Sequence, residues 1–344
     1  MGEGDTPRGL RRFVAPVLGA VLAVAGMEVV VRDVYTVRTT WDPEIGVLYD
    51  PGTPVRWRRE GNGTSHWDAR GVRANAHAVT ASAGTIVVRG DSFTEALMVN
   101  DDEAFPSLVQ DALQAAGLDA AVLNIGRSTD SAADHVAHAD RTRRVFAPAW
   151  VVVQLREEDF TAEAWDDTSA RFVTGSDGAL AVESAPLTPS AVREAFGPLE
   201  RRSMLVAYGL LRVAEMEQAS RDQPPLFRAA DGSPPPPPKD ERVYPIAEEL
   251  DAIVKAYEGR VTLVWLTDRE PNDPERAFDA FCTKSGASCV SARPAFDALR
   301  EQGHSPYGFA NTVPESGHIN KHGHRAVSDA LAGELLRLRT NGLL

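Results

Sequence analysis

Short apolar runs separated by amphipathic segments dominate the middle of this sequence. Each run is four to seven residues long, which is typical of buried strands and too short for buried helices. The runs lie at 85–89, 119–124, 149–155 and 260–266, with a weaker one at 288–291. Amphipathic stretches lie between several of them, and strands that alternate with helices form parallel sheets through right-handed crossovers. The sequence therefore predicts an α/β fold built on a parallel sheet.

A gap of about a hundred residues separates the third run from the fourth, far longer than the usual connection between elements. We interpret it as an insertion at about 160–258. Within it, 170–184 predicts a β-hairpin that turns at 176–178, and 193–218 predicts a helix. The proline run at 232–239 predicts an exposed, disordered loop, with a ligand for a proline-binding domain as the alternative.

The N-terminus carries the other strongly apolar stretch. Arg8, Arg11 and Arg12 precede residues 13–31, which contain a single charged residue, Glu28. The stretch is close to the ~20 residues that a spanning helix needs, and basic residues before it predict a cytoplasmic N-terminus. We therefore expect a transmembrane anchor, with a cleaved signal peptide as the alternative. In both cases the rest of the chain leaves the cytoplasm.

These features divide the chain into four segments. Residues 1–12 form a cytoplasmic tail, 13–31 the anchor, 32–84 a polar segment without clear periodicity, and 85–344 the main domain.

The net charge of −13 argues against a nucleic-acid partner, because phosphate backbones require clustered lysine and arginine.

The two cysteines, Cys282 and Cys289, flank a turn-rich spacer. In an oxidising compartment such a pair predicts a small-loop disulfide, with two free thiols as the alternative. A zinc site is not expected, because no second pair of ligands stands at a suitable spacing.

Reactive side chains are expected where the first apolar run ends, at Gly90-Asp91-Ser92, because ligands bind beyond the carboxyl ends of parallel strands. Far along the chain, His318 lies in a polar turn before the last amphipathic segment. Acyl transfer needs a nucleophile, a base, and a group that holds the base in its productive tautomer. Ser92 and His318 supply the first two, and Glu315 or a backbone carbonyl the third.

Several blocks of the chain share a pattern in their order and spacing. They are VVRGDSFTEALMVNDDEAFPSLV at 87–109, VLNIGRSTDS at 122–131, VVVQLREEDF at 151–160 and GHINKHGH at 317–324, preceded by DPEIGVLYDPG at 42–52 and ARGVRAN at 69–75. With these blocks the chain resembles the SGNH (GDSL-type) hydrolase superfamily, in its membrane-anchored bacterial branch. The resemblance implies a three-layer α/β/α fold with a flavodoxin-like parallel sheet. It also implies ester hydrolysis or acyl transfer without a metal or cofactor.

Carried over residue by residue, the resemblance makes Ser92 the nucleophile and His318 the general base. Asp91 is expected to cap the turn that follows it, and Asn320 to brace the loop that carries His318. The backbone N–H of Ser92 would be one donor to the oxyanion. The triad acid, expected two or three residues before the histidine, would be Glu315, since Ser316 is the other residue in reach.

Two positions depart from the family pattern in the oxyanion hole. Thr129 stands where a glycine is usual, and its N–H would be the second donor. Glu158 stands where an asparagine usually donates through its amide; an ionised carboxylate accepts only, and it repels an oxyanion. Since only a protonated Glu158 would donate, we hypothesise a narrow, acid-shifted activity optimum.

Together these residues predict an exported, membrane-tethered serine esterase or O-acyltransferase that acts on acylated glycans or other small esters. The alternative is a catalytically silent protein of the same fold that binds a glycan or a membrane partner.

Overall fold

The computed structural model describes most of the chain. It covers residues 8–34, 36–75, 77, 84–128, 130–160, 170–175, 179–184, 195, 199, 202–209, 212, 246–267, 270–313 and 315–344. The expected hairpin turn at 176–178, the proline run at 232–239, most of the expected helix at 193–218 and Thr129 lie outside these residues.

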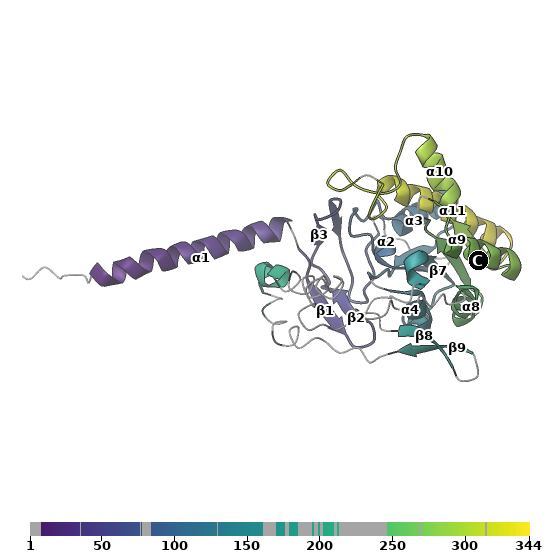
Figure 1. Ribbon diagram of the computed structural model, residues 1–344, viewed down its shortest axis with the longest axis horizontal. Helices are drawn as coiled ribbons and strands as arrows, with labels where there is room; N and C mark the ends of the chain where they lie inside the picture. The colour runs from purple at the N-terminus through teal and green to yellow at the C-terminus, as the bar shows by residue number, and fades with distance from the viewer. Residues whose placement is uncertain are drawn as a thin grey trace, which may run out of the picture.

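A five-stranded parallel sheet forms the centre of the molecule (Figure 1). Its strands are β5 (Thr85–Arg89), β6 (Ala121–Asn124), β7 (Trp150–Leu155), β10 (Val261–Trp265) and β11 (Ser288–Ser291). They lie in the order β11-β10-β7-β5-β6, and every neighbouring pair is parallel. Numbered along the chain, this is the flavodoxin-like order 2-1-3-4-5. The predicted α/β fold with a parallel sheet is confirmed, and the five apolar runs are its five strands.

Helices cover both faces of this sheet and make the three layers. On one face lie α3 (Phe105–Ala115), α10 (Arg293–Glu301) and α11 (Lys321–Thr340). On the other lie α4 (Ala132–Ala137), α5 (Ala139–Phe146), α8 (Ile246–Ala256) and α9 (Asp273–Ser285). All six residues of β7 are buried, because alternate side chains enter the two opposite cores. That is why β7 is apolar at five of its six positions instead of alternating, with Gln154 as the one polar residue.

The segment before the sheet folds into two short antiparallel pairs. These are β1 (Thr39–Asp42) with β2 (Gly46–Tyr49), and β3 (Val55–Trp57) with β4 (Gly63–Ser65). Val55 and Trp67 pack against Leu97 and Met98, which follow the first turn after β5. The turn between β3 and β4 is thereby held beside the carboxyl end of the sheet, where the site residues lie.

Helix α1 (Arg8–Val34) extends away from the sheet (Figure 1). Its single acidic residue within the apolar stretch, Glu28, accepts hydrogen bonds from the backbone N–H groups of Met204 and Leu205, at 2.8 and 2.9 Å. Burial alone would raise the pKa of Glu28, but these bonds and that of Arg32 lower it to about 2. The predicted transmembrane anchor falls on this helix; among the described residues, no helix combines the length and apolarity needed to cross a membrane.

Two smaller predictions can also be compared with the structure. In the insertion, β8 (Ala170–Thr174) pairs antiparallel with β9 (Leu180–Ser184), as the hairpin prediction requires. The predicted disulfide is confirmed: Cys282 in α9 is bonded to Cys289 in β11, with 6.1 Å between the Cα atoms.

Candidate active site

Ser92 stands in the sharp turn that follows β5. Gly90 permits this turn, because a Cβ there would lie 2.2 Å from Thr94 Oγ1 and 2.5 Å from Gln154 Oε1. The carboxylate of Asp91 accepts a hydrogen bond from the N–H of Phe93 at 2.9 Å and so caps the short helix α2 (Ser92–Glu95). As the first residue of α2, Ser92 has an N–H that the helix does not use.

His318 meets Ser92 from the other end of the chain. Its Nε2 lies 2.8 Å from Ser92 Oγ. The loop that carries it is fixed by Asn320, whose amide oxygen caps α11 and whose amide nitrogen donates to the carbonyl oxygens of Ser305 and Gly308. The two residues that the sequence assigns to nucleophile and base are therefore in hydrogen-bond contact.

Glu60, in the turn between β3 and β4, holds the other side of the histidine ring. Its Oε2 lies 2.6 Å from His318 Nδ1, and its Oε1 accepts the backbone N–H of His318 at 2.7 Å. An ionised carboxylate only accepts, so Nδ1 is the donor and Nε2 is free to accept the proton of Ser92. Burial alone would raise the pKa of Glu60, but the two bonds to His318 lower it below its ordinary value.

The structure thus gives the acid's place to Glu60 and not to Glu315. The Glu315 carboxylate faces Arg300, 3.6 Å from its Nε, and the hydroxyl of Ser316 donates to the carbonyl of Val313. Neither reaches the imidazole. Proximity in sequence favoured Glu315, whereas Glu60 is 258 residues from His318 and belongs to a segment without periodicity. No local signal in the sequence marks it.

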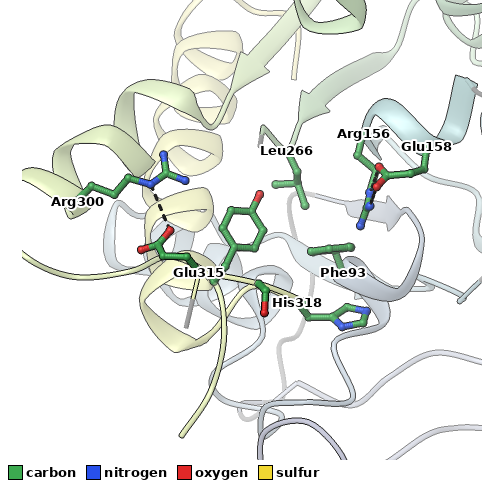
Figure 2. Close-up of a pocket in the computed structure, with 10 residues that line it drawn as sticks. Phe93, Arg156, Glu158, Leu266, Arg300, Glu315 and His318 are labelled. Carbon is green, nitrogen blue, oxygen red and sulfur yellow. Dashed lines mark hydrogen bonds and ion pairs between the residues drawn. The ribbon is translucent and has the colours of Figure 1, made fainter. Parts of the chain in front are cut away.

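A cleft of about 300 Å³ opens beside the imidazole (Figure 2). Its walls hold two aromatic rings, two arginines and two glutamates. The lining residues are Phe93, Arg156, Glu158, Leu266, Arg300, Tyr307, Glu315, Ser316, Gly317 and His318. Each arginine lies beside a glutamate, so the formal charges of the walls balance.

Glu158 lies in the 3₁₀ turn Glu157–Phe160 that follows β7, and it pairs with Arg156. Arg156 Nε donates to Glu158 Oε2 at 2.6 Å, and its Nη2 contacts Glu158 Oε1. The glutamate side chain is 45 % exposed, so it is not enclosed in the cleft. The expected role of Glu158 as an oxyanion donor is not what the structure shows, because its carboxylate is taken up by an arginine that the sequence analysis did not single out.

Arg156 contacts both residues that flank Ser92. Its Nε lies 3.9 Å from Asp91 Oδ2, and its Cζ lies 4.4 Å from the centroid of the Phe93 ring. Burial would lower the pKa of Arg156, but the bond to Glu158 and the charge of Asp91 raise it above its ordinary value. The guanidinium is therefore permanently charged at the edge of the cleft.

Residues of the second sequence block, at 122–131, pack against the short helix α2 and bond to it. Asn124 donates through its amide to the carbonyl of Thr94 at 2.8 Å, and it accepts the N–H of Gly126 at 3.0 Å. A Cβ at Gly126 would lie 2.4 Å from the backbone nitrogen of Glu95, so only glycine fits this contact. Thr129, the expected second oxyanion donor, lies outside the described residues.

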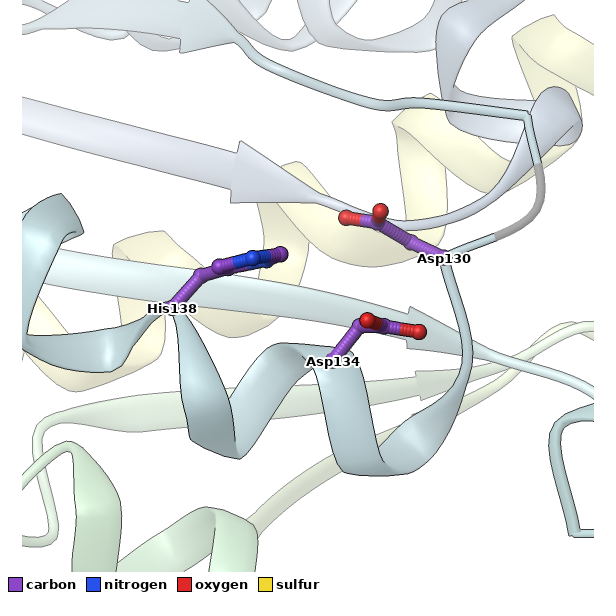
Figure 3. Close-up of side chains that lie close together, drawn as sticks. All are labelled: Asp130, Asp134 and His138. Atoms are coloured by element: carbon purple, nitrogen blue, oxygen red, sulfur yellow. The ribbon is translucent and has the colours of Figure 1, made fainter. Parts of the chain in front are cut away.

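Away from the cleft, the described part of the chain contains one cluster of side chains of the types that bind metal ions. Ligand atoms of Asp130, Asp134 and His138 lie within 4.8 Å of one another, all buried (Figure 3). Arg89 enters this group, with its Nη2 2.7 Å from Asp130 Oδ2 and 3.3 Å from His138 Nδ1. A buried guanidinium already supplies the positive charge here, so the donor set fits an internal ion pair better than a metal ion.

No family model and no curated protein sequence matches the chain. Solved structures with a related arrangement include a variant of Axe2, an acetyl-xylooligosaccharide esterase from Geobacillus stearothermophilus, at 14 % identity and a TM-score of 0.41, over 75 % of this chain and 96 % of that one. TesA aligns at 13 % identity and a TM-score of 0.40, over 74 % and 99 %. LAE5, an alpha/beta hydrolase enzyme from the metagenome of Lake Arreo, Spain, aligns at 15 % identity and a TM-score of 0.40, over 74 % of this chain and 95 % of that one. Similarity at this level does not transfer an activity to this chain.

Proposed function

We propose that this chain is a serine hydrolase or acyltransferase of the SGNH type, acting on esters. The observation that carries the proposal is the continuous chain of contacts from Ser92 Oγ through His318 to Glu60, at 2.8 and 2.6 Å. These distances lie within the range that nucleophile–base and base–acid pairs need.

The reaction follows from that geometry. His318 Nε2 accepts the proton of Ser92 Oγ while Oγ bonds to the carbonyl carbon, and the C=O electron pair moves to oxygen. When the C=O re-forms, the bond to the alkoxy group breaks, and that group leaves with the proton from His318. Water or a sugar hydroxyl then gives its proton to His318 while its oxygen bonds to the acyl carbon. As the bond from that carbon to Ser92 Oγ breaks, His318 returns the proton to Oγ, and the acyl group leaves on the acceptor. Glu60 stabilises the imidazolium in both halves.

The cleft suggests the class of substrate. About 300 Å³ is the small end of the range for ligand pockets, and polar walls with aromatic faces suit a short acyl group on a polar alcohol. We propose acylated glycans or other small esters, with hydrolysis or transfer decided by the acceptor.

The location is part of the same proposal. The disulfide and the arginine-flanked apolar stretch at 13–31 support an extracytoplasmic domain, tethered by that stretch or released by its cleavage. An alkaline phosphatase fusion after residue 60 should be active; an inactive fusion, beside an active cytoplasmic reporter at the same site, would refute this location.

A catalytically silent binding protein is the second candidate, favoured by the Arg156–Glu158 pair where the family has an asparagine. A fluorophosphonate probe on the folded protein decides between them. Labelling mapped to Ser92 supports the enzyme, and absence of labelling in a protein with an intact thermal transition supports the binder.

A further inference from the structure

The described part of the site supplies only one backbone donor for an oxyanion. Ser92 offers its N–H at the start of α2. In the second block the N–H groups of Gly126 and Arg127 donate to Asn124 Oδ1 and to the carbonyl of Gly90, and that of Ser128 donates to the Glu95 carboxylate. Developing negative charge on a carbonyl oxygen therefore needs a donor from another element.

Arg156 is a cationic group that lines the cleft and contacts the turn that carries Ser92. It follows β7, the neighbour of β5 in the sheet, and touches the residues on both sides of Ser92. Ligands of sheets with this strand order bind beyond the carboxyl ends of the first and third strands, which are β5 and β7 here. Figure 2 shows the guanidinium and the His318 ring on opposite sides of the Phe93 ring.

The ion pair with Glu158 leaves one edge of the guanidinium available. A guanidinium has five N–H donors in a rigid fork. Glu158 takes up Nε and Nη2. In the region that the structure describes, no acceptor receives a hydrogen bond from Arg156 Nη1. The glutamate therefore fixes the plane of the arginine while its Nη1 donors remain free for a ligand.

We infer that Arg156, oriented by Glu158, donates to the oxyanion that forms during acyl transfer, in place of a side-chain amide. This inference rests on the proposed esterase or acyltransferase function. A charged donor makes a stronger hydrogen bond to an anion than a neutral amide does. Phe93 separates the guanidinium from the imidazole, whose centroid lies 4.7 Å from that of the phenyl ring, so the cation serves the oxyanion without contacting the base.

The inference also replaces the hypothesis of an acid-shifted optimum. That hypothesis required a protonated Glu158 as donor. With Glu158 as the ionised partner of Arg156, no protonation of this residue is needed, and activity persists at neutral and mildly alkaline pH.

The experiment measures kcat and KM for a neutral aryl acetate with the full chain and its Arg156→Met variant. An interaction made only in the transition state lowers kcat and leaves KM nearly unchanged, so we expect kcat to fall by about 10²–10³-fold. Added guanidinium ion should restore part of kcat. The matched control is Arg337→Met, which removes an arginine paired with Glu334 on the exposed side of α11 and should change neither constant.

Glu158→Gln and Arg156→Lys complete the set. Glu158→Gln keeps the arginine but loosens its plane, so kcat should fall less than in Arg156→Met, at every pH. Arg156→Lys keeps the positive charge but loses the forked set of N–H donors, so its kcat should also lie between those of wild type and Arg156→Met. It is the test variant if Arg156→Met does not fold.

Two results would overturn the inference while the proposed function stands, provided that the fluorophosphonate labels wild type at Ser92. The first is a kcat of Arg156→Met within about threefold of wild type. The second is a raised KM with kcat unchanged, which would mean that Arg156 binds the ground state. A wild type that neither reacts with the probe nor hydrolyses the ester would instead refute the proposed function.

Discussion

The structure places histidines beside carboxylates at several points, and two of these regions behave in opposite ways. At the carboxyl end of the sheet, His318 is partly exposed and both oxygens of Glu60 bond to it. Between α4 and α5, His138 is buried near Asp130 (Figure 3). Arg89 Nη2 contacts both residues, 2.7 Å from Asp130 Oδ2 and 3.3 Å from His138 Nδ1.

The two regions differ in the cationic group that pairs with the carboxylate. Burial first, and then the charge of Arg89, lower the pKa of His138 to about 4 and that of His135 to about 3. Both rings are therefore neutral in the folded protein. Glu60 has His318 as its partner, and would stabilise the protonated ring in the proposed reaction. The carboxylate of Glu60 is thus placed to support His318 as a base in the proposed reaction, whereas that of Asp130 is already paired with Arg89.

The largest effect should separate the two histidines directly. His318→Ala removes the base and should lower kcat/KM by about 10⁴-fold or more, as Ser92→Ala should. His138→Gln should leave kcat/KM within about threefold and lower the melting temperature instead. Steady-state kinetics and thermal melts on the same preparations test both; full activity in His318→Ala would break the comparison.

The two carboxylates should differ in the same way. Glu60→Gln no longer fixes the tautomer of His318, and kcat should fall by about 10²–10⁴-fold with little change in melting temperature. Asp130→Asn leaves the Arg89 guanidinium buried without its partner, which should cost about 3–5 kcal/mol of folding free energy and spare kcat.

Glu315→Gln is the control for Glu60→Gln, because it neutralises a glutamate that lines the cleft without contacting the imidazole. We expect a small change in kcat. A loss as large as that of Glu60→Gln would return the acid's role to Glu315.

The pH dependence of stability should report the buried histidines. Their pKa values of about 4 and 3 lie below the ordinary 6.5, so the unfolded chain binds more protons than the folded one between these values. Their contribution to stability is complete above 6.5 and is lost as the pH falls toward 4 and 3. Melting temperatures measured from about pH 7 to about pH 4 should fall, and His138→Gln should flatten the decline.

The smallest effect should come from a change that touches neither histidine region. Replacing Cys282 and Cys289 by serine opens a loop with a sequence separation of 7 residues, which should cost less than the ~3 kcal/mol of a 15-residue loop. Denaturant titrations should show the same pH dependence as wild type, displaced to lower stability. An altered slope against pH would mean that the disulfide is coupled to the buried cluster.

The sequence predicts those parts of this molecule whose causes are local. The run at 85–89 coincides with β5, because a strand covered on both faces is mostly apolar, here at Ile86, Val87 and Val88. Asp91 and Ser92 follow at its end, where a parallel sheet places ligands. His318 could be paired with Ser92 because each stands in a recognisable block.

The rest depends on contacts between distant segments. Glu60 carries no local pattern, since a glutamate in a polar turn is ordinary in composition and becomes an acid of the site only when β3 and β4 dock beside α2. Arg156 likewise follows a buried strand, where an arginine resembles a solvated surface residue. The role expected of Glu158 rests on the family pattern alone, whereas the arginine that it pairs with, Arg156, stands two positions earlier.

The separation of Ser92, His318 and Glu60 along the chain has a consequence for how the protein is made. Glu60 and Ser92 leave the ribosome long before His318, which follows 258 and 226 residues later. Contacts of such high sequence separation form late in folding, because the entropy of closing the loop must be met first. The contacts that join Ser92, His318 and Glu60 therefore form only after His318 has been synthesised, and a chain that stops before α10 holds Ser92 and Glu60 without the base that the proposed reaction needs. In refolding, the proposed ester hydrolysis should return later than the helical signal, so that activity reports on the completion of the fold.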